Sequence, residues 1–163
     1  MIPLLIDAFP LLAPKSGVGY YTWHLLSALR ESHTREFDVT YFYGRRVSKE
    51  LLPRPSPFDT VARSTLKRLL PNPYRLTQPV KEFVFRRAVA RLRPALYHET
   101  NYVLLPFDGP QVATVFDMSI ARFPDTHPRT RVAFFNRYFY RRIADATRVI
   151  VISEFTRNEL LEL

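Results

Sequence analysis

Short apolar runs alternate with longer amphipathic segments along this 163-residue chain. The apolar runs are rich in β-branched and aromatic residues, a composition typical of buried strands. Because strands and helices alternate and the strands are apolar throughout, the pattern predicts a Rossmann-like α/β fold whose doubly wound sheet is mostly parallel. The expected strands are 3–6, 38–42, 95–98, 111–116 and 148–152.

Apolar residues recur at helical spacing between most of these strands. Pro79 suits the first position of a helix that ends before Pro94, and Ser153 suits the N-cap of the last helix. The expected helices are 18–30, 79–93, 130–145 and 153–161.

The alternation is interrupted by a proline-rich, basic stretch. We interpret about 44–94 as an insertion, with a short helix near 61–70, into a single domain that spans 1–163. A chain of this length can bury a core of its own.

The net charge of +9 is concentrated in one segment. Residues 61–94 hold nine basic residues and one acidic residue, so they contribute nearly all of it. A localised basic field indicates an anionic partner such as a membrane surface, a nucleic acid or a phosphorylated substrate. We expect Arg86, Arg87, Arg91 and Arg93 to contact an anionic membrane; the alternative is a solvated surface helix whose arginines only cover apolar area.

Other features of the composition limit the class of protein. Cysteine is absent, which excludes disulfides and thiolate metal sites. The apolar start lacks a basic region and is interrupted by Asp7 and Pro10, so we interpret it as the first strand and not as a signal peptide. No run approaches the roughly 18 apolar residues of a spanning helix, and we expect a cytoplasmic protein.

Polar residues follow the apolar runs where the carboxyl ends of parallel strands meet, the usual ligand site of an open α/β sheet. Asp117 is the first candidate because a carboxylate there can accept a proton or a hydrogen bond from a hydroxyl; the alternative is an Asx turn. His98 could act as acid, base or donor, or merely hold the loop that contains Asn101. Arg122 is near enough in sequence to pair with Asp117 or with an anionic ligand.

The loop between the first strand and the first helix ends in Gly17, Val18 and Gly19. Glycines at a helix N-terminus let backbone N–H groups approach an anion. The alternative is a tight turn without a ligand. His24 and His33 are expected at the surface.

Four segments, in this order and spacing, resemble the acceptor-side N-terminal domain of the retaining group-1 (family 4) glycosyltransferases, which have the GT-B fold. They are IDAFPLLAPKSGVGYYTWHLLSAL (6–29), ALYHETNYVLLP (95–106), VATVFDMSIARFPDTHP (112–128) and RVIVISEFTRNEL (148–160). The resemblance spans nearly the whole chain except for about 44–94.

The resemblance implies transfer of a sugar, with retention of configuration, from a nucleotide sugar to a lipid-linked or polysaccharide acceptor in cell-envelope glycan synthesis. GDP-mannose is the first expectation for the donor. The nucleotide sugar is a co-substrate, so no cofactor and no metal are expected. It further implies a peripheral position on the inner face of the cytoplasmic membrane. Asn101 and Arg122 are then expected to bind the acceptor, and Gly17–Gly19 the donor phosphate or the acceptor.

Two departures from the family pattern matter. The family usually has a histidine where this chain has Phe116, which makes Asp117 the leading candidate base and His98 the second. The resemblance also implies a C-terminal domain that binds the nucleotide sugar, and Leu163 lies about where the linker to that domain is expected to start. We therefore expect the acceptor-binding half of an enzyme, inactive alone, whose partner is that domain or subunit.

Two other functions are compatible with the sequence. The first is a stand-alone basic Rossmann-like module that binds nucleic acid or a protein; no nucleic-acid motif supports it, and no nucleic acid is expected as a partner. The second is a complete single-domain nucleotide-binding enzyme, which the absence of a GxGxxG pattern after the first strand disfavours.

Overall fold

A computed structural model describes residues 1–12, 16–32, 35–52 and 73–163. Six strands form one sheet in the order β3-β2-β1-β4-β5-β6, and every neighbouring pair is parallel except β2 and β3. The five predicted strands are confirmed, and the short antiparallel β3 is an addition. Their bounds are β1 (Ile2–Asp7), β2 (Phe37–Phe42), β3 (Val47–Ser48), β4 (Leu96–Glu99), β5 (Gln111–Val115) and β6 (Arg148–Val151).

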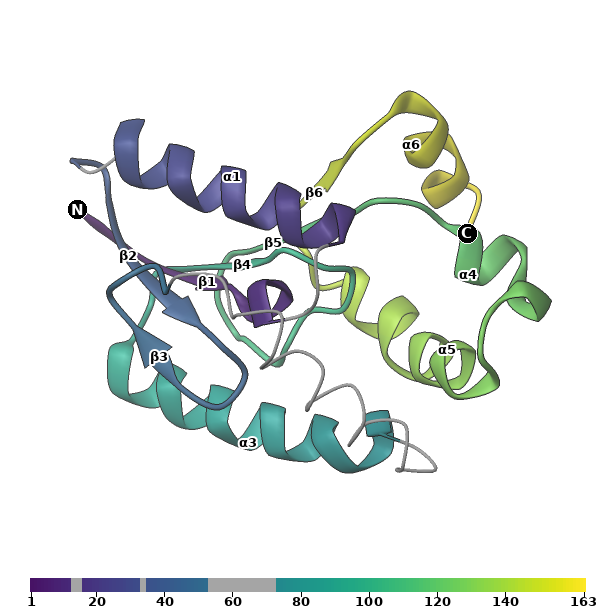
Figure 1. Ribbon diagram of the computed structural model, residues 1–163, viewed down its shortest axis with the longest axis horizontal. Helices are drawn as coiled ribbons and strands as arrows, with labels where there is room; N and C mark the ends of the chain where they lie inside the picture. The colour runs from purple at the N-terminus through teal and green to yellow at the C-terminus, as the bar shows by residue number, and fades with distance from the viewer. Residues whose placement is uncertain (13–15, 33–34, 53–72) are drawn as a thin grey trace.

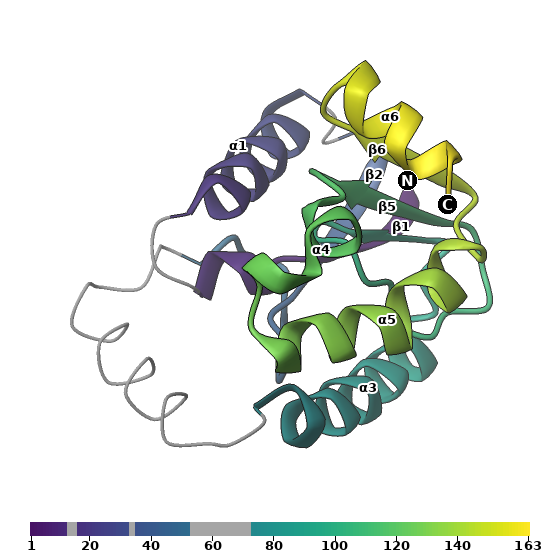
Figure 2. The ribbon, with the colours of Figure 1, turned by 90° about the vertical axis from the view of Figure 1, so that its right-hand side faces the viewer.

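Helices cover both faces of the sheet, as the α/β pattern predicts. Figures 1 and 2 show α1 and α6 on one side and α3 and α5 on the other. The bounds are α1 (Gly17–Ser32), α3 (Pro73–Leu92), α4 (Ser119–Arg122), α5 (Arg129–Ile143) and α6 (Glu154–Leu161), with 3-10 turns η1 (Phe9–Leu12) and η2 (Pro124–Thr126). The predicted N-cap of α6 is confirmed, because the Ser153 hydroxyl accepts from the Thr156 N–H at 3.1 Å.

The core has two layers because side chains alternate along each strand. On one face of β1, Leu4 and Ile6 pack with Leu26 of α1. On the other face, Leu5 packs in a cluster with Phe85 of α3. The Phe85 ring lies 5.3 Å from that of Phe42 and 4.7 Å from that of Tyr97, centroid to centroid.

Helix α3 corrects two expectations. It begins at Pro73, so Pro79 lies inside the helix and does not start it. Phe85 is fully buried, and Val84 and Val89 pack against the same cluster. The C-terminal part of the expected insertion is therefore a core helix of the domain. The short helix expected near 61–70 falls outside the described residues.

The strand order reverses direction between β1 and β4. From β1 the chain builds outward to β2 on one side and from β4 to β6 on the other. In open α/β sheets, ligands bind at the carboxyl ends of the strands beside such a point. Among the described helices, none is both long and apolar enough to cross a membrane.

Candidate functional site at the carboxyl edge of the sheet

Two groups of polar side chains lie at the carboxyl edge. The first, which we call the Asp117 network, follows β4 and β5 and consists of Tyr102, Asp117, Ser119 and His127. The second, which we call the buried carboxyl cluster, lies at the ends of β1 and β4 and consists of Asp7, Lys81, Tyr97 and Glu99.

Asp117 is held by three hydrogen bonds. Its Oδ2 accepts from the Tyr102 hydroxyl at 2.7 Å, and its Oδ1 accepts from the Ser119 N–H at 2.9 Å and the Ser119 hydroxyl at 2.5 Å. The Ser119 hydroxyl is in turn 3.1 Å from His127 Nε2. The bond to the N–H two residues on is the Asx turn that the sequence left as an alternative. The Asp117 side chain is nevertheless exposed and open to a ligand.

The hydrogen bonds keep Asp117 ionised. Burial opposes the charge, but the bonds from Ser119 and Tyr102 outweigh it and lower the pKa of the Asp117 carboxyl. An ionised carboxylate accepts hydrogen bonds from hydroxyl groups well, although a lowered pKa makes it a weak general base. The network therefore suits the binding of a hydroxyl-bearing ligand at neutral pH.

His98 lies inside the sheet. Its side chain is 7% exposed, and its Nε2 is 3.0 Å from the hydroxyl of Thr114 on β5. Burial lowers its pKa to about 4, so the imidazole is neutral at physiological pH. The ring thus ties β4 to β5, not the loop that we considered, and its catalytic role stays a prediction that this burial does not favour. His24 is exposed on α1 as expected, and His33 lies outside the described residues.

The glycine loop is brought beside the Asp117 network. Gly17, Val18 and Gly19 form the first turn of α1, where the Ser16 hydroxyl accepts from the Gly19 N–H at 3.2 Å. On the next turn, the Tyr21 ring meets the Phe116 ring edge-on at 5.1 Å. Phe116 also lies 5.9 Å from the Tyr102 ring, so an aromatic contact occupies the position where a histidine was expected.

Arg122 and Asn101 are the two residues that were expected to bind the acceptor. Arg122 pairs with Glu159 of α6 at 3.5 Å and with Glu162, which follows α6, so the suggested pairing with Asp117 is wrong. Its role in acceptor binding stays a prediction. Asn101 is exposed beyond β4, and its backbone N–H donates to Glu99 Oε1 at 3.2 Å. The backbone N–H of Asn101 is thus occupied, whereas its exposed side chain can reach a ligand at this edge.

All four predicted membrane-contact arginines are exposed: Arg86, Arg87, Arg91 and Arg93. The apolar residues Val84, Phe85 and Val89 of the same helix face the core and are not available to a membrane. Instead, Val80 and Phe83 are 50% and 61% exposed, and the Arg87 guanidinium lies 5.8 Å from the centre of the Phe83 ring.

The buried carboxyl cluster was not predicted. Asp7 and Glu99 are each 1% exposed and end β1 and β4. Lys81 Nζ of α3 lies 2.8 Å from Asp7 Oδ2, and the Phe9 N–H donates to Asp7 Oδ1 at 2.7 Å. Glu99 accepts from the Tyr97 hydroxyl at 2.6 Å.

Two carboxyl groups and one ammonium share this dry site, and their pKa values move accordingly. Burial and the neighbouring Asp7 charge raise the pKa of Glu99 well above its usual range, which favours the neutral form of this carboxyl group. Burial works against the charge on Lys81, but its ion pair and hydrogen bond with Asp7 outweigh burial and raise the Lys81 pKa. The cluster is therefore a Lys81–Asp7 ion pair beside a neutral Glu99.

The protonated Glu99 predicts a pH dependence of stability. In the unfolded chain Glu99 loses its proton in the ordinary carboxyl range, whereas the folded protein retains it. The folded state then binds more protons, so unfolding free energy falls as pH rises from that range toward the raised pKa. Glu99→Gln, which keeps a neutral donor, should flatten this fall in thermal melts from about pH 5 to pH 9. A variant that follows the wild-type profile would show that Glu99 is ionised in the fold.

Among the described residues, His, Asp and Glu nowhere gather in a group of three that could hold a metal ion.

Comparison with known proteins gives residues 15–163 as a match to the family described as Glycosyltransferase Family 4. The chain is also 25% identical to the O-antigen chain mannosyltransferase B of Escherichia coli, over 94% of this chain and 42% of that protein. The chain thus spans less than half the length of this relative. No solved structure matches this chain.

Proposed function

The chain belongs to glycosyltransferase family 4, and we propose that it is the acceptor-binding half of a retaining enzyme. That enzyme would move a sugar from a nucleotide sugar to a lipid-linked or polysaccharide acceptor of the cell envelope. The observation that carries the proposal is the Asp117 network at the carboxyl edge of the sheet. In this network an exposed, ionised carboxylate lies near the N-terminus of α1. The relative's name supports mannose as the sugar, and hence GDP-mannose as the donor.

In the proposed reaction, an acceptor hydroxyl bonds to the anomeric carbon of the donor as the bond from that carbon to the diphosphate breaks. The diphosphate leaves with the bonding electrons. Asp117 accepts a hydrogen bond from the attacking hydroxyl and orients it, held in turn by Tyr102 and Ser119. The hydroxyl proton passes to Asp117 or to the departing phosphate. The lowered pKa of Asp117 makes it a weak base and leaves the phosphate as the second acceptor.

The glycine loop supplies only part of the charge stabilisation that the departing diphosphate needs. Its helix dipole favours an anion, but Gly19 already donates to Ser16. We therefore propose that a nucleotide-sugar-binding half is the partner of this chain, and that the chain alone does not catalyse transfer. No metal is required in this scheme.

Donor affinity tests this division of labour. The 163-residue chain should bind GDP-mannose and UDP-glucose only weakly, because few backbone donors face the diphosphate. Isothermal titration calorimetry with each nucleotide sugar is the direct measurement. Micromolar affinity for either would place the donor site on this chain and contradict the proposal.

We further propose that α3 docks the domain onto an anionic membrane from the cytoplasm. The exposed Val80 and Phe83 precede the exposed arginines along this helix, and their two apolar side chains can insert between lipids. Each basic residue near an anionic surface is worth about 1 kcal/mol, so four give useful but reversible binding that salt screens.

Charge reversal tests the membrane proposal. Changing all four exposed arginines of this surface to glutamate (Arg86, Arg87, Arg91 and Arg93) should abolish co-sedimentation with phosphatidylglycerol vesicles at low salt and leave the circular dichroism spectrum unchanged. The matched control reverses four exposed arginines elsewhere, Arg30, Arg35, Arg46 and Arg148. Equal losses in the two variants would mean that net charge alone causes binding, and α3 would have no special role.

A further inference from the structure

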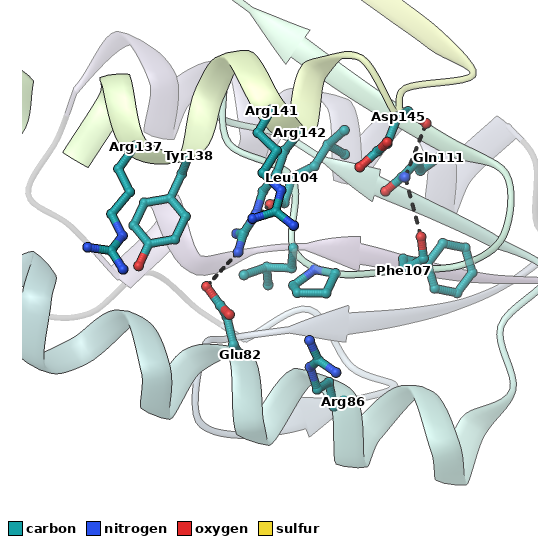
Figure 3. Close-up of a pocket in the computed structure, with 12 residues that line it drawn as sticks. Glu82, Arg86, Leu104, Phe107, Gln111, Arg137, Tyr138, Arg141, Arg142 and Asp145 are labelled. Atoms are coloured by element: carbon teal, nitrogen blue, oxygen red, sulfur yellow. Dashed lines mark hydrogen bonds and ion pairs between the residues drawn. The ribbon is translucent and has the colours of Figure 1, made fainter. Parts of the chain in front are cut away.

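A cavity of about 440 Å³ lies between α3 and α5, on the face of the sheet opposite α1 (Figure 3). Gln111, the first residue of β5, lines it, whereas Asp117 follows the other end of that strand. The cavity is thus distinct from the candidate site. We infer that it binds a phosphate ester that also carries hydroxyl groups.

The lining of the cavity is rich in arginine. Arg86 comes from α3, and Arg137 and Arg141 from α5; all three are exposed. Within the described parts of the chain, no carboxylate lies within ion-pair distance of these three guanidinium groups. Guanidinium groups match the oxygens of phosphate, which they bind through paired N–H donors. The positive charge of this cavity therefore favours the binding of an anion.

The two carboxylates of the lining do not cancel this charge. Glu82 is already paired with a fourth arginine, Arg142, at 2.7 Å, and Arg142 also donates to the Leu104 carbonyl at 2.9 Å. Figure 3 shows this pair bridging α3 and α5 between the other arginines. Asp145 is the remaining acid. Three uncompensated arginines thus face one free carboxylate.

Gln111 adds a requirement for a hydrogen-bond donor. Its side chain is 4% exposed, and its Oε1 has no partner among the described residues. The amide orientation is fixed, because Nε2 donates to the carbonyls of Asp145 at 3.1 Å and Phe107 at 3.4 Å. A buried acceptor without a donor is rare in folded proteins. A phosphate dianion has no donor to offer, whereas a hydroxyl of a phosphate ester supplies one.

Glycerol 3-phosphate has this chemistry in its simplest form. The same group occurs free in solution and as the headgroup of a phospholipid, and the cavity volume falls in the usual range for small-ligand sites. The exposed Phe83, which directly follows Glu82 and lies about one turn before Arg86 on α3, places an apolar surface beside the cavity.

The test is a titration of the 163-residue chain with glycerol 3-phosphate at about pH 8, where the phosphate is fully ionised. We expect saturable binding that Arg137→Ala/Arg141→Ala weakens about tenfold or more. Arg35→Ala/Arg46→Ala removes the same charge from exposed positions outside the cavity and should leave the affinity unchanged. A lack of saturable binding, or equal weakening in both variants, would overturn the inference.

A second measurement isolates Gln111. The wild type should prefer glycerol 3-phosphate to methyl phosphate, which carries no alcohol hydroxyl, and Gln111→Met should remove the preference. A wild type without this preference would contradict the assigned role of Gln111.

A displacement experiment distinguishes a free ester from a lipid headgroup as the ligand. Free glycerol 3-phosphate should displace the wild type from phosphatidylglycerol vesicles if the headgroup occupies the cavity. Saturable binding without displacement assigns the cavity to a free ester, independently of the membrane proposal.

Discussion

Replacing Lys81 with methionine should lower the free energy of unfolding by about 3–5 kcal/mol, the usual cost of breaking a buried ion pair from one side. The Asp7 carboxylate is 1% exposed and has Lys81 Nζ at 2.8 Å as its cationic partner. Methionine fills a similar volume but leaves this charge uncompensated in a dry site. Urea denaturation at neutral pH gives the loss directly.

An exposed ion pair provides the matched control. Lys49 pairs with Asp38 at the surface, where the two side chains are 55% and 49% exposed. Lys49→Met should therefore cost about 1 kcal/mol or less. Adding Asp7→Asn to the Lys81 variant should recover part of its loss, because the unpaired charge disappears. If both lysine variants cost equally little, the buried carboxyl cluster does not hold α3 to the sheet.

Replacing Asp117 with asparagine should lower the turnover of the reconstituted enzyme about 10²-fold, the lower end of the range for general-base catalysis. The lower end applies because hydrogen bonds depress the Asp117 pKa and weaken it as a base. Asparagine can still accept from the Ser119 N–H, so the Asx turn and the fold should survive. Steady-state rates with nucleotide sugar and acceptor measure the loss of turnover. Circular dichroism of the same variant shows whether the fold is retained.

Asp125→Asn is the control for this variant. Asp125 is an exposed carboxylate in the neighbouring η2 turn, and it has no part in the Asp117 network. Its loss should leave turnover unchanged. Near-normal turnover in the Asp117 variant would assign the proton to the departing phosphate or to another group.

The fold was predictable because its signals are local. Apolar runs at the five parallel strands and amphipathic spacing at the helices each arise from a single segment of sequence. Two features depended on other parts of the chain. The two-residue β3 forms only because Tyr41 and Phe42 offer it an edge. Helix α3 runs through Pro79, since the packing of Phe85 between Phe42 and Tyr97 outweighs the local preference of proline for a helix start.

The candidate site was only partly predictable. Asp117 stood out because it follows an apolar strand directly, and the glycine loop because it precedes a helix. Asp7 and Glu99 also end strands, but nothing local indicates that Lys81, 74 residues from Asp7 in sequence, lies between them. Likewise, Tyr102 and His127 join the Asp117 network only through the tertiary fold. The sequence thus indicates which edge of the sheet carries the candidate site, but it does not reveal the partners that set the pKa values there.

The most direct test of the account is transfer of labelled mannose from GDP-mannose to a lipid-linked glycan acceptor. The chain would be supplied with a nucleotide-sugar-binding half, either as one polypeptide or as a separate subunit. We expect transfer with retention of anomeric configuration, none from either half alone, and a strong decrease with Asp117→Asn. Transfer by the 163-residue chain alone, or undiminished transfer when the Asp117 network is disrupted, would contradict the assignment of this edge as the acceptor site.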